Sequence, residues 1–133
     1  MDEELDYLKA VTAWAINRYH AKPPYPELVL AKGLVDTKSN ETVLGMFHVK
    51  DGKPIISISE EAPNRMEATV SLFHEFHHYL DWKNNPNLHD WTKGKVLPRD
   101  HPLELAHEKT AYEDARAFMS FVQSRLEVSK GSR

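Results

Sequence analysis

The sequence predicts a single α+β domain that spans residues 1–133. Three long segments space their apolar residues three to four positions apart, and three short strand-like runs lie between the first two of them. A hydrophobic share of 41% and a charged share of 28% are typical of a folded globular protein. The expected order is an N-terminal helix, a small three-stranded and mostly antiparallel sheet, a second helix, a long loop, and a C-terminal helix that carries glutamates.

The N-terminal helix is expected from Asp2 to about His20, because apolar side chains recur there at helical spacing. A proline-rich stretch follows and ends it. Three strands are expected next: Glu27–Ala31, Thr42–Lys50 and Pro54–Ser59. The dipeptide Asp51-Gly52 separates the last two strands and predicts a tight hairpin between them.

The second helix has a recognisable start. Asn64 is followed three residues later by Glu67, a pattern like a capping box, so the helix is expected from there to about Lys83. Residues 84–100 contain proline, glycine and asparagine and predict a loop. A proline at position 102 suits the first position of a last helix, which is expected to run to about Leu126.

Composition excludes several classes of function. The chain has no cysteine, which rules out disulfides, thiolate zinc sites and cysteine nucleophiles. A net charge of -3 gives no basic surface for nucleic acid or for an anionic membrane. The first residues are acidic rather than basic, and no apolar run approaches membrane-spanning length. We therefore expect a cytoplasmic protein that binds neither nucleic acid nor membrane.

The second helix carries the pattern H-E-x-x-H. His74 and His78 lie four residues apart, so their side chains stand one above the other on one face of the helix. Glu75 lies one step round from His74, near any ion that the pair binds. Two imidazoles beside a carboxylate are the donors of a zinc site with a general base, so one Zn²⁺ per chain is expected. His77 falls on the apolar side and is expected to be a buried core histidine.

A catalytic zinc ion usually has three protein ligands, and the C-terminal helix offers candidates for the third. Glu108 is the carboxylate on the apolar stripe that we trace along this helix from Leu105 to Val122. A charged residue on a core face is rarely left unpaired, so Glu108 is the first candidate. Glu113 is the next candidate, and Glu104, near the start of the helix, is a poorer one. Glu113 and Asp114 are otherwise expected to face solvent.

The motif His74-Glu75-x-x-His78, followed by Glu108-x-x-Ala111, resembles that of the gluzincin zinc metallopeptidases. The closest likeness is to the minigluzincins and to the ImmA/IrrE-like peptidase domains. The resemblance covers most of the chain in layout, although only the two motifs are specific. It implies a peptidase acting on a peptide or protein substrate, with His74, His78 and Glu108 as zinc ligands and Glu75 as the general base.

One position departs from the family pattern. Tyr112 stands where the family commonly has Asp or Asn after the alanine, a residue that often supports a ligand histidine. Tyr112 or Asp81 is the candidate for that supporting role, and Tyr112 is also a candidate oxyanion donor. In the family the strand before the motif helix binds the peptide substrate, which points to Ile55–Ser59 as the rim of the site.

Three further hypotheses follow from the same residues. The long loop of residues 84–100 contains Leu88, Trp91, Val96 and Leu97, and it either folds back over a groove and keeps the enzyme latent, like a zymogen, or leaves the groove open while Trp91 caps a secondary core. An alternative to a general peptidase is a regulatory factor of the ImmA/IrrE type that binds or cleaves one protein target. A second alternative is a non-catalytic domain in which zinc only holds the helices together.

Overall fold

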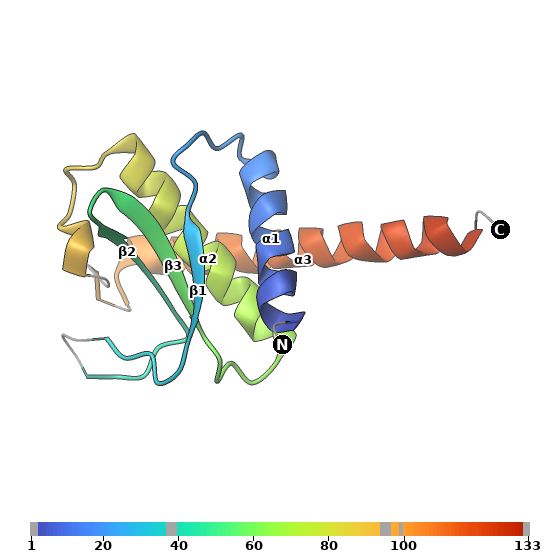
Figure 1. Cartoon of the computed structure of the whole chain (residues 1–133), viewed down its shortest axis with the longest axis horizontal. Coiled ribbons are helices and arrows are strands. Elements are labelled where there is room, and N and C mark those ends of the chain that lie inside the picture. The colour runs from blue at the N-terminus through green and yellow to red at the C-terminus, as the bar shows by residue number, and fades with distance from the viewer. Residues whose placement is uncertain (1–2, 37–39, 94–96, 99, 132–133) are drawn as a thin grey trace.

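The computed structural model describes the backbone of residues 3–36, 40–93, 97–98 and 100–131, and the side chains of these residues up to 125. Figure 1 shows how the elements are arranged. In chain order they are α1 (Glu3–Arg18), β1 (Glu27–Ala31), β2 (Gly45–Lys50), β3 (Lys53–Ser59), α2 (Arg65–Asn84), the short 3-10 helix η1 (Trp91–Lys93) and α3 (Pro102–Gly131). The α+β fold, with a helix at each end and a three-stranded sheet, is as the sequence predicts.

The sheet has the strand order β1-β3-β2, so the last strand in sequence is the central one. β2 and β3 form the predicted antiparallel hairpin, and Asp51 and Gly52 at its turn have φ angles of 53° and 77°. Two consecutive positive φ angles suit the right-handed twist of a hairpin. β1 pairs parallel with β3, so the sheet is mixed rather than mostly antiparallel.

This topology corrects the prediction that Ile55–Ser59 forms the rim of the site. These residues pair with β1 along one side and, as far as Ile58, with β2 along the other. A strand that is paired on both sides has few backbone groups left to bind an added chain. β2 is the edge strand on the side of the sheet away from β1.

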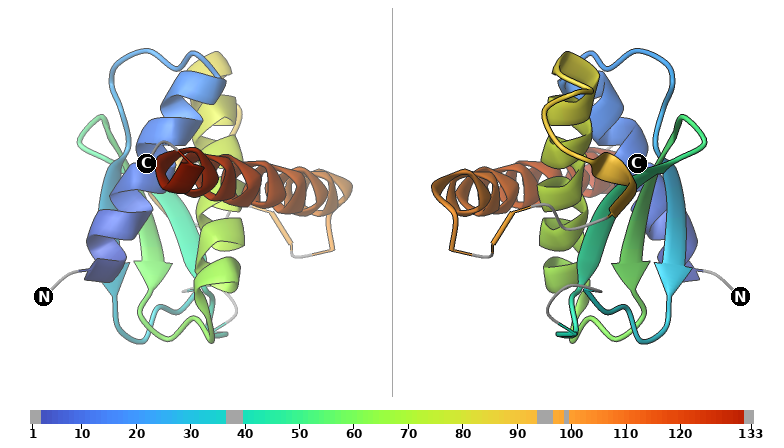
Figure 2. Two further views of the ribbon diagram at one scale, coloured as in Figure 1. Left: turned by 90° about the vertical axis from the view of Figure 1, so that its right-hand side faces the viewer. Right: turned by 90° about the vertical axis from the view of Figure 1, so that its left-hand side faces the viewer.

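The helix α2 is the central packing element of the molecule. It contacts β2 and β3 of the sheet and also contacts α1 and α3, as Figures 1 and 2 show. Asn64 caps its start as predicted, since the side chain accepts a hydrogen bond of 2.8 Å from the backbone N–H of Glu67. Phe73 and Phe76 are fully buried in the core with Ile56 of β3. A helix that is packed on several sides holds its remaining polar residues in fixed positions.

The helix α3 starts at Pro102 as predicted but continues to Gly131, beyond the expected end near Leu126. No proline interrupts this last part, and a glycine ends it. In Figure 1 the C-terminal part of α3 extends away from the other elements, whereas its N-terminal part passes behind the sheet. Among the helices that the structure describes, none is long and apolar enough to cross a membrane.

The loop between α2 and α3 is packed against the rest of the protein at Trp91. This side chain is buried, and its ring lies 5.7 Å from the ring of Phe47 on β2 and 6.4 Å from that of His78. Trp91 is therefore part of the hydrophobic core. The hypothesis of latency concerns a loop whose residues 94–96 and 99 lie outside the described part of the chain.

Candidate metal centre

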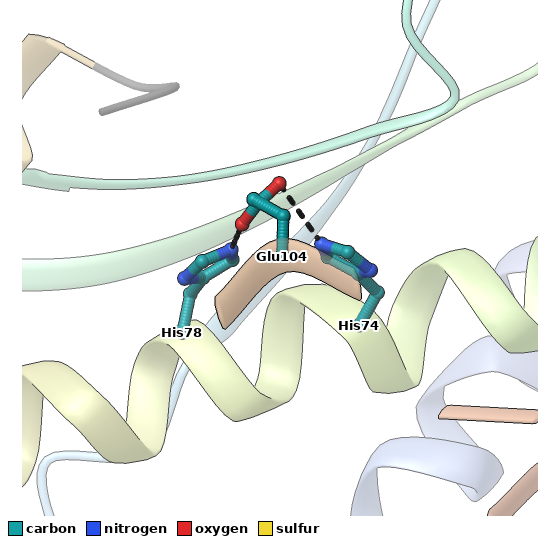
Figure 3. A group of neighbouring side chains, drawn as sticks. All are labelled: His74, His78 and Glu104. Atoms are coloured by element: carbon teal, nitrogen blue, oxygen red, sulfur yellow. Dashed lines mark hydrogen bonds and ion pairs between the residues drawn. The ribbon is translucent and has the colours of Figure 1, made fainter. Parts of the chain in front are cut away.

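The two histidines of the motif face the same point in space. His74 and His78 stand one turn apart on α2, with ring centres 5.3 Å apart. Glu104, in the first turn of α3, reaches between them, as Figure 3 shows. Its Oε2 lies 3.3 Å from Nε2 of His74, and its Oε1 lies against Nε2 of His78. Two imidazole nitrogens and one carboxylate thus converge from two helices.

Glu104 is buried where a carboxylate is seldom found without a partner. Only 7% of the residue is exposed. Burial alone would raise the pKa of Glu104, but hydrogen bonds from His74 and His78 outweigh it and lower the pKa well below its usual range. Oε1 forms an ion pair with Nε2 of His78, and Oε2 forms one with Nε2 of His74. Both oxygens of this buried carboxylate therefore face imidazole nitrogens.

The donor set fits a zinc ion. His74, His78 and Glu104 each offer a ligand atom, and these atoms lie within 4.8 Å of one another. Two nitrogens and one oxygen are typical of catalytic zinc sites, which leave a fourth position for water or substrate. All three side chains are largely buried, so bulk water competes little for the ion. These three residues can therefore hold a metal ion.

Glu108, the sequence's first candidate for the third ligand, lies outside this cluster. Its side chain is 52% exposed, and its Oε1 lies 3.2 Å from Nδ1 of His74, the ring nitrogen that faces away from the cluster. The apolar stripe traced on α3 is rotated in the first two turns, because Leu105 is 58% exposed whereas Glu104 is buried. Ala111, Ala115 and Phe118 of the same stripe are buried as predicted.

Glu75 occupies the position that the motif predicts for a general base. It is 3% exposed and lies on the wall of a cleft of about 710 Å³ that also includes His74 and Glu104. Gly45, the first residue of β2, lies directly against it. A Cβ atom at position 45 would approach Cγ of Glu75 to 3.0 Å and Oε2 to 3.3 Å, which is closer than ordinary contacts. Position 45 therefore has to be small for the carboxylate to stand where it does.

Asp81, a predicted supporting residue, lies behind His78. Its Oδ2 is 4.0 Å from Nδ1 of His78 and accepts a hydrogen bond of 2.7 Å from Nε2 of His107. Tyr112, the other predicted supporting residue, packs against the hydrophobic core and does not line the cleft. The oxyanion role suggested for Tyr112 is thus not supported by its position.

His77 is a buried core histidine, as the sequence predicts. Its Nε2 donates a hydrogen bond of 2.8 Å to Asp114 of α3, which also accepts bonds from Tyr19 and Arg18 of the α1 region. Asp114 is 1% exposed, so the expectation that it faces solvent is wrong. The physical reason is that three donors from two other parts of the chain satisfy a buried carboxylate. Glu113, the second candidate for the third ligand, is exposed and is not part of the group formed by His74, His78 and Glu104.

The sequence ranked Glu104 only as a poorer candidate ligand and did not identify Gly45, although each had a weak signal. Glu104 follows the helix-starting Pro102 by two residues, which places a carboxylate in the first turn of α3. Gly45 interrupts the second strand-like run, where an isolated glycine often marks a close approach of another group. Neither signal identifies the residue that is contacted. Glu104 contacts His74 and His78 and Gly45 contacts Glu75, and all three lie on α2, far from Glu104 and Gly45 in the sequence.

Comparisons of this chain with protein-family models, with curated proteins and with solved structures gave no match.

Proposed function

We propose that the protein is a zinc-dependent peptidase of the gluzincin type, with His74, His78 and Glu104 as the metal ligands. The observation that carries the proposal is the convergence of these three side chains next to a cleft whose wall includes His74, Glu104 and the buried carboxylate of Glu75. A metal site that only joined two helices would have no need for an adjoining cleft or for a further carboxylate at its wall. Glu104 replaces Glu108 as third ligand in this proposal.

Zinc, when bound, lowers the pKa of a coordinated water to about 7 and polarises a substrate carbonyl. Glu75 takes a proton from the attacking water as the water oxygen bonds to the carbonyl carbon. The same carboxyl group then gives that proton to the amine nitrogen as the C–N bond breaks. Its burial beside Gly45 fixes the carboxylate, so that little reorganisation is needed during proton transfer.

Substrate binding is supported by the edge strand. β2 has β3 on one side only, and its first residue, Gly45, lines the cleft next to Glu75. An extended peptide can add to such an edge through backbone hydrogen bonds, which bring a peptide carbonyl towards the metal ligands. We therefore assign peptide binding to β2 rather than to β3.

The proposal is tested by zinc content and hydrolysis together. The purified chain is expected to hold about one zinc ion, measured by elemental analysis, and to cleave members of a diverse peptide library. Glu75→Gln keeps the shape of the side chain and the three ligands, so zinc should remain while hydrolysis falls by more than about 100-fold. Glu113→Gln, at an exposed position on α3, is the matched control and should change neither quantity.

The outcomes separate the alternatives. Zinc without hydrolysis of any peptide, in the wild type and after limited cleavage of the 84–100 loop, would favour a structural metal site. Hydrolysis that persists in Glu75→Gln would show that the base is misassigned. Cleavage of one protein target, with generic peptides left intact, would favour the regulatory factor over a general peptidase.

A further inference from the structure

Each imidazole in the proposed centre has a second nitrogen that faces away from the metal. A histidine that binds zinc through Nε2 must carry its proton on Nδ1, and a carboxylate near Nδ1 favours that tautomer. Nδ1 of His74 has Glu108 at 3.2 Å. Nδ1 of His78 has Oδ2 of Asp81 at 4.0 Å, which is too long for a hydrogen bond but short enough for the negative charge to favour a proton on Nδ1.

Asp81 does not stand alone behind His78. His107 of α3 donates a hydrogen bond of 2.7 Å from Nε2 to Oδ2 of Asp81, and its ring centre lies 4.9 Å from that of His78 at an interplanar angle of 85°. The side chains of His107 and Asp81 are 13% and 29% exposed, so solvent screens their interaction only in part. His107 thus fixes the carboxylate on the side of His78 that is turned away from Glu104.

The same three residues could be read as a second metal site, because their donor atoms also lie within 4.8 Å of one another. His78 would then have to bind one ion through each ring nitrogen. A neutral imidazole has only one nitrogen lone pair available, since the other nitrogen carries the proton. Nε2 of His78 is already directed at Glu104. A supporting role therefore agrees better with the chemistry than a second ion does.

We infer that Asp81 and His107 form a positioning pair that holds His78 in the ring orientation and tautomer needed for metal binding. This inference rests on the proposed metal centre and adds two residues to it. Neither residue touches the metal or the substrate. Asp81 acts on Nδ1 of His78, and His107 acts on Asp81.

The pair is joined to the core through a second contact. The His107 ring stacks on the ring of His77 at 5.5 Å, with an interplanar angle of 20°. His77 is fixed in turn by its 2.8 Å hydrogen bond to Asp114. The orientation of His78 is consequently supported from α3 through residues that are not mobile surface side chains.

The test measures zinc affinity of the full chain by competition with a chromophoric chelator, and the absorption spectrum of the cobalt-substituted protein. Asp81→Ala is expected to weaken zinc binding by about 10–100-fold, the effect typical of a lost supporting carboxylate. His107→Ala should weaken it in the same direction but less. The double variant should bind zinc no more weakly than Asp81→Ala, because His107 acts only through Asp81. Asp81→Glu should restore part of the affinity.

Controls separate this role from general destabilisation. The cobalt spectrum should change in Asp81→Ala, whereas Glu113→Gln should leave both spectrum and affinity unchanged. Wild-type affinity in Asp81→Ala, in a protein whose wild type binds one zinc ion, overturns the positioning pair and leaves the metal centre intact. Two zinc ions per wild-type chain, with one lost in Asp81→Ala, also overturn it and establish a second metal site. A wild type that binds no zinc overturns both proposals.

Discussion

The two histidines of the proposed centre are supported in different ways. Behind His74 stands Glu108, a half-exposed carboxylate beside the cleft. Behind His78 stands Asp81, which accepts a hydrogen bond from His107. The His107 ring stacks on His77, and His77 is hydrogen-bonded to the buried Asp114. One histidine is therefore supported from the solvent side and the other from the core.

This difference separates metal binding from stability. An exposed charge contributes little to folding, because water and salt screen it. A buried carboxylate with three donors cannot lose its partners without a large cost. A substitution at Glu108 should therefore change zinc affinity and leave stability unchanged. A substitution at Asp114 should mainly lower the free energy of unfolding. The following predictions test this contrast.

The largest effect is expected at Asp114. Asp114→Ala removes the acceptor shared by His77, Tyr19 and Arg18 and leaves buried donors unpaired. The free energy of unfolding should fall by about 3–5 kcal/mol, the range for breaking a buried ion pair. Urea unfolding of the metal-free protein measures it. If the midpoint and the slope of the urea unfolding curve were unchanged, Asp114 would not be the stabilising residue that we propose.

Acid should weaken the same interaction. Burial alone would raise the pKa of Asp114, but hydrogen bonds from His77 and Tyr19 outweigh it and keep the pKa below its ordinary value of 3.8. The ionised form is then favoured in the folded state, so its contribution is full above pH 3.8 and is lost as the pH falls through the folded pKa. The stability advantage of wild type over Asp114→Asn should thus be constant near pH 6 and shrink below about pH 4.

The next effect is expected at Glu104. Glu104→Gln keeps the size of the side chain but replaces a charged ligand by a neutral one. Zinc affinity should fall by more than about 100-fold, because loss of a supporting residue alone costs up to about that much. Chelator competition measures it, with Glu113→Gln as the control on the same helix. Full affinity in Glu104→Gln together with loss of zinc in Glu108→Gln would restore Glu108 as the third ligand.

The smallest effect is expected at Glu108. Glu108→Gln leaves the three proposed ligands in place and removes only the charge beside Nδ1 of His74. Zinc affinity should fall by about 10-fold, the lower end for a supporting carboxylate. The free energy of unfolding of the metal-free protein should change by less than about 0.5 kcal/mol, since the side chain is half exposed. A stability loss as large as that of Asp114→Ala would remove the contrast between the two sides.

The parts of the fold that local chemistry determines were predictable from the sequence. The Asp51-Gly52 turn and the Asn64 cap depend on residues next to them, and both have the expected geometry. The spacing of His74 and His78 depends only on helical periodicity, and the two rings face a common point. The burial of His77 followed from the apolar residues on its side of the helix.

What the sequence did not predict depends on contacts between distant segments. The parallel pairing of β1 with β3 requires a strand from later in the chain to enter between two earlier ones. The third ligand depended on the rotation of α3, which was inferred from an apolar stripe. That stripe is reliable in the middle of the helix, but its first turn exposes Leu105 and buries Glu104. A buried carboxylate paired with two histidines takes the place of an apolar side chain there, so polarity alone gave the wrong face.

Gly45 makes part of this site recognisable in other sequences. A chain with the histidine motif but a larger residue at the start of its edge strand would have to displace its motif glutamate, because the space at Gly45 lies within 3.0 Å of Glu75. Such a chain could retain all three metal ligands and still lack a correctly placed base. A search for sequences with the same candidate site should therefore require three separated features: the motif, a glutamate in the first turn of the following helix, and a glycine at the start of the edge strand.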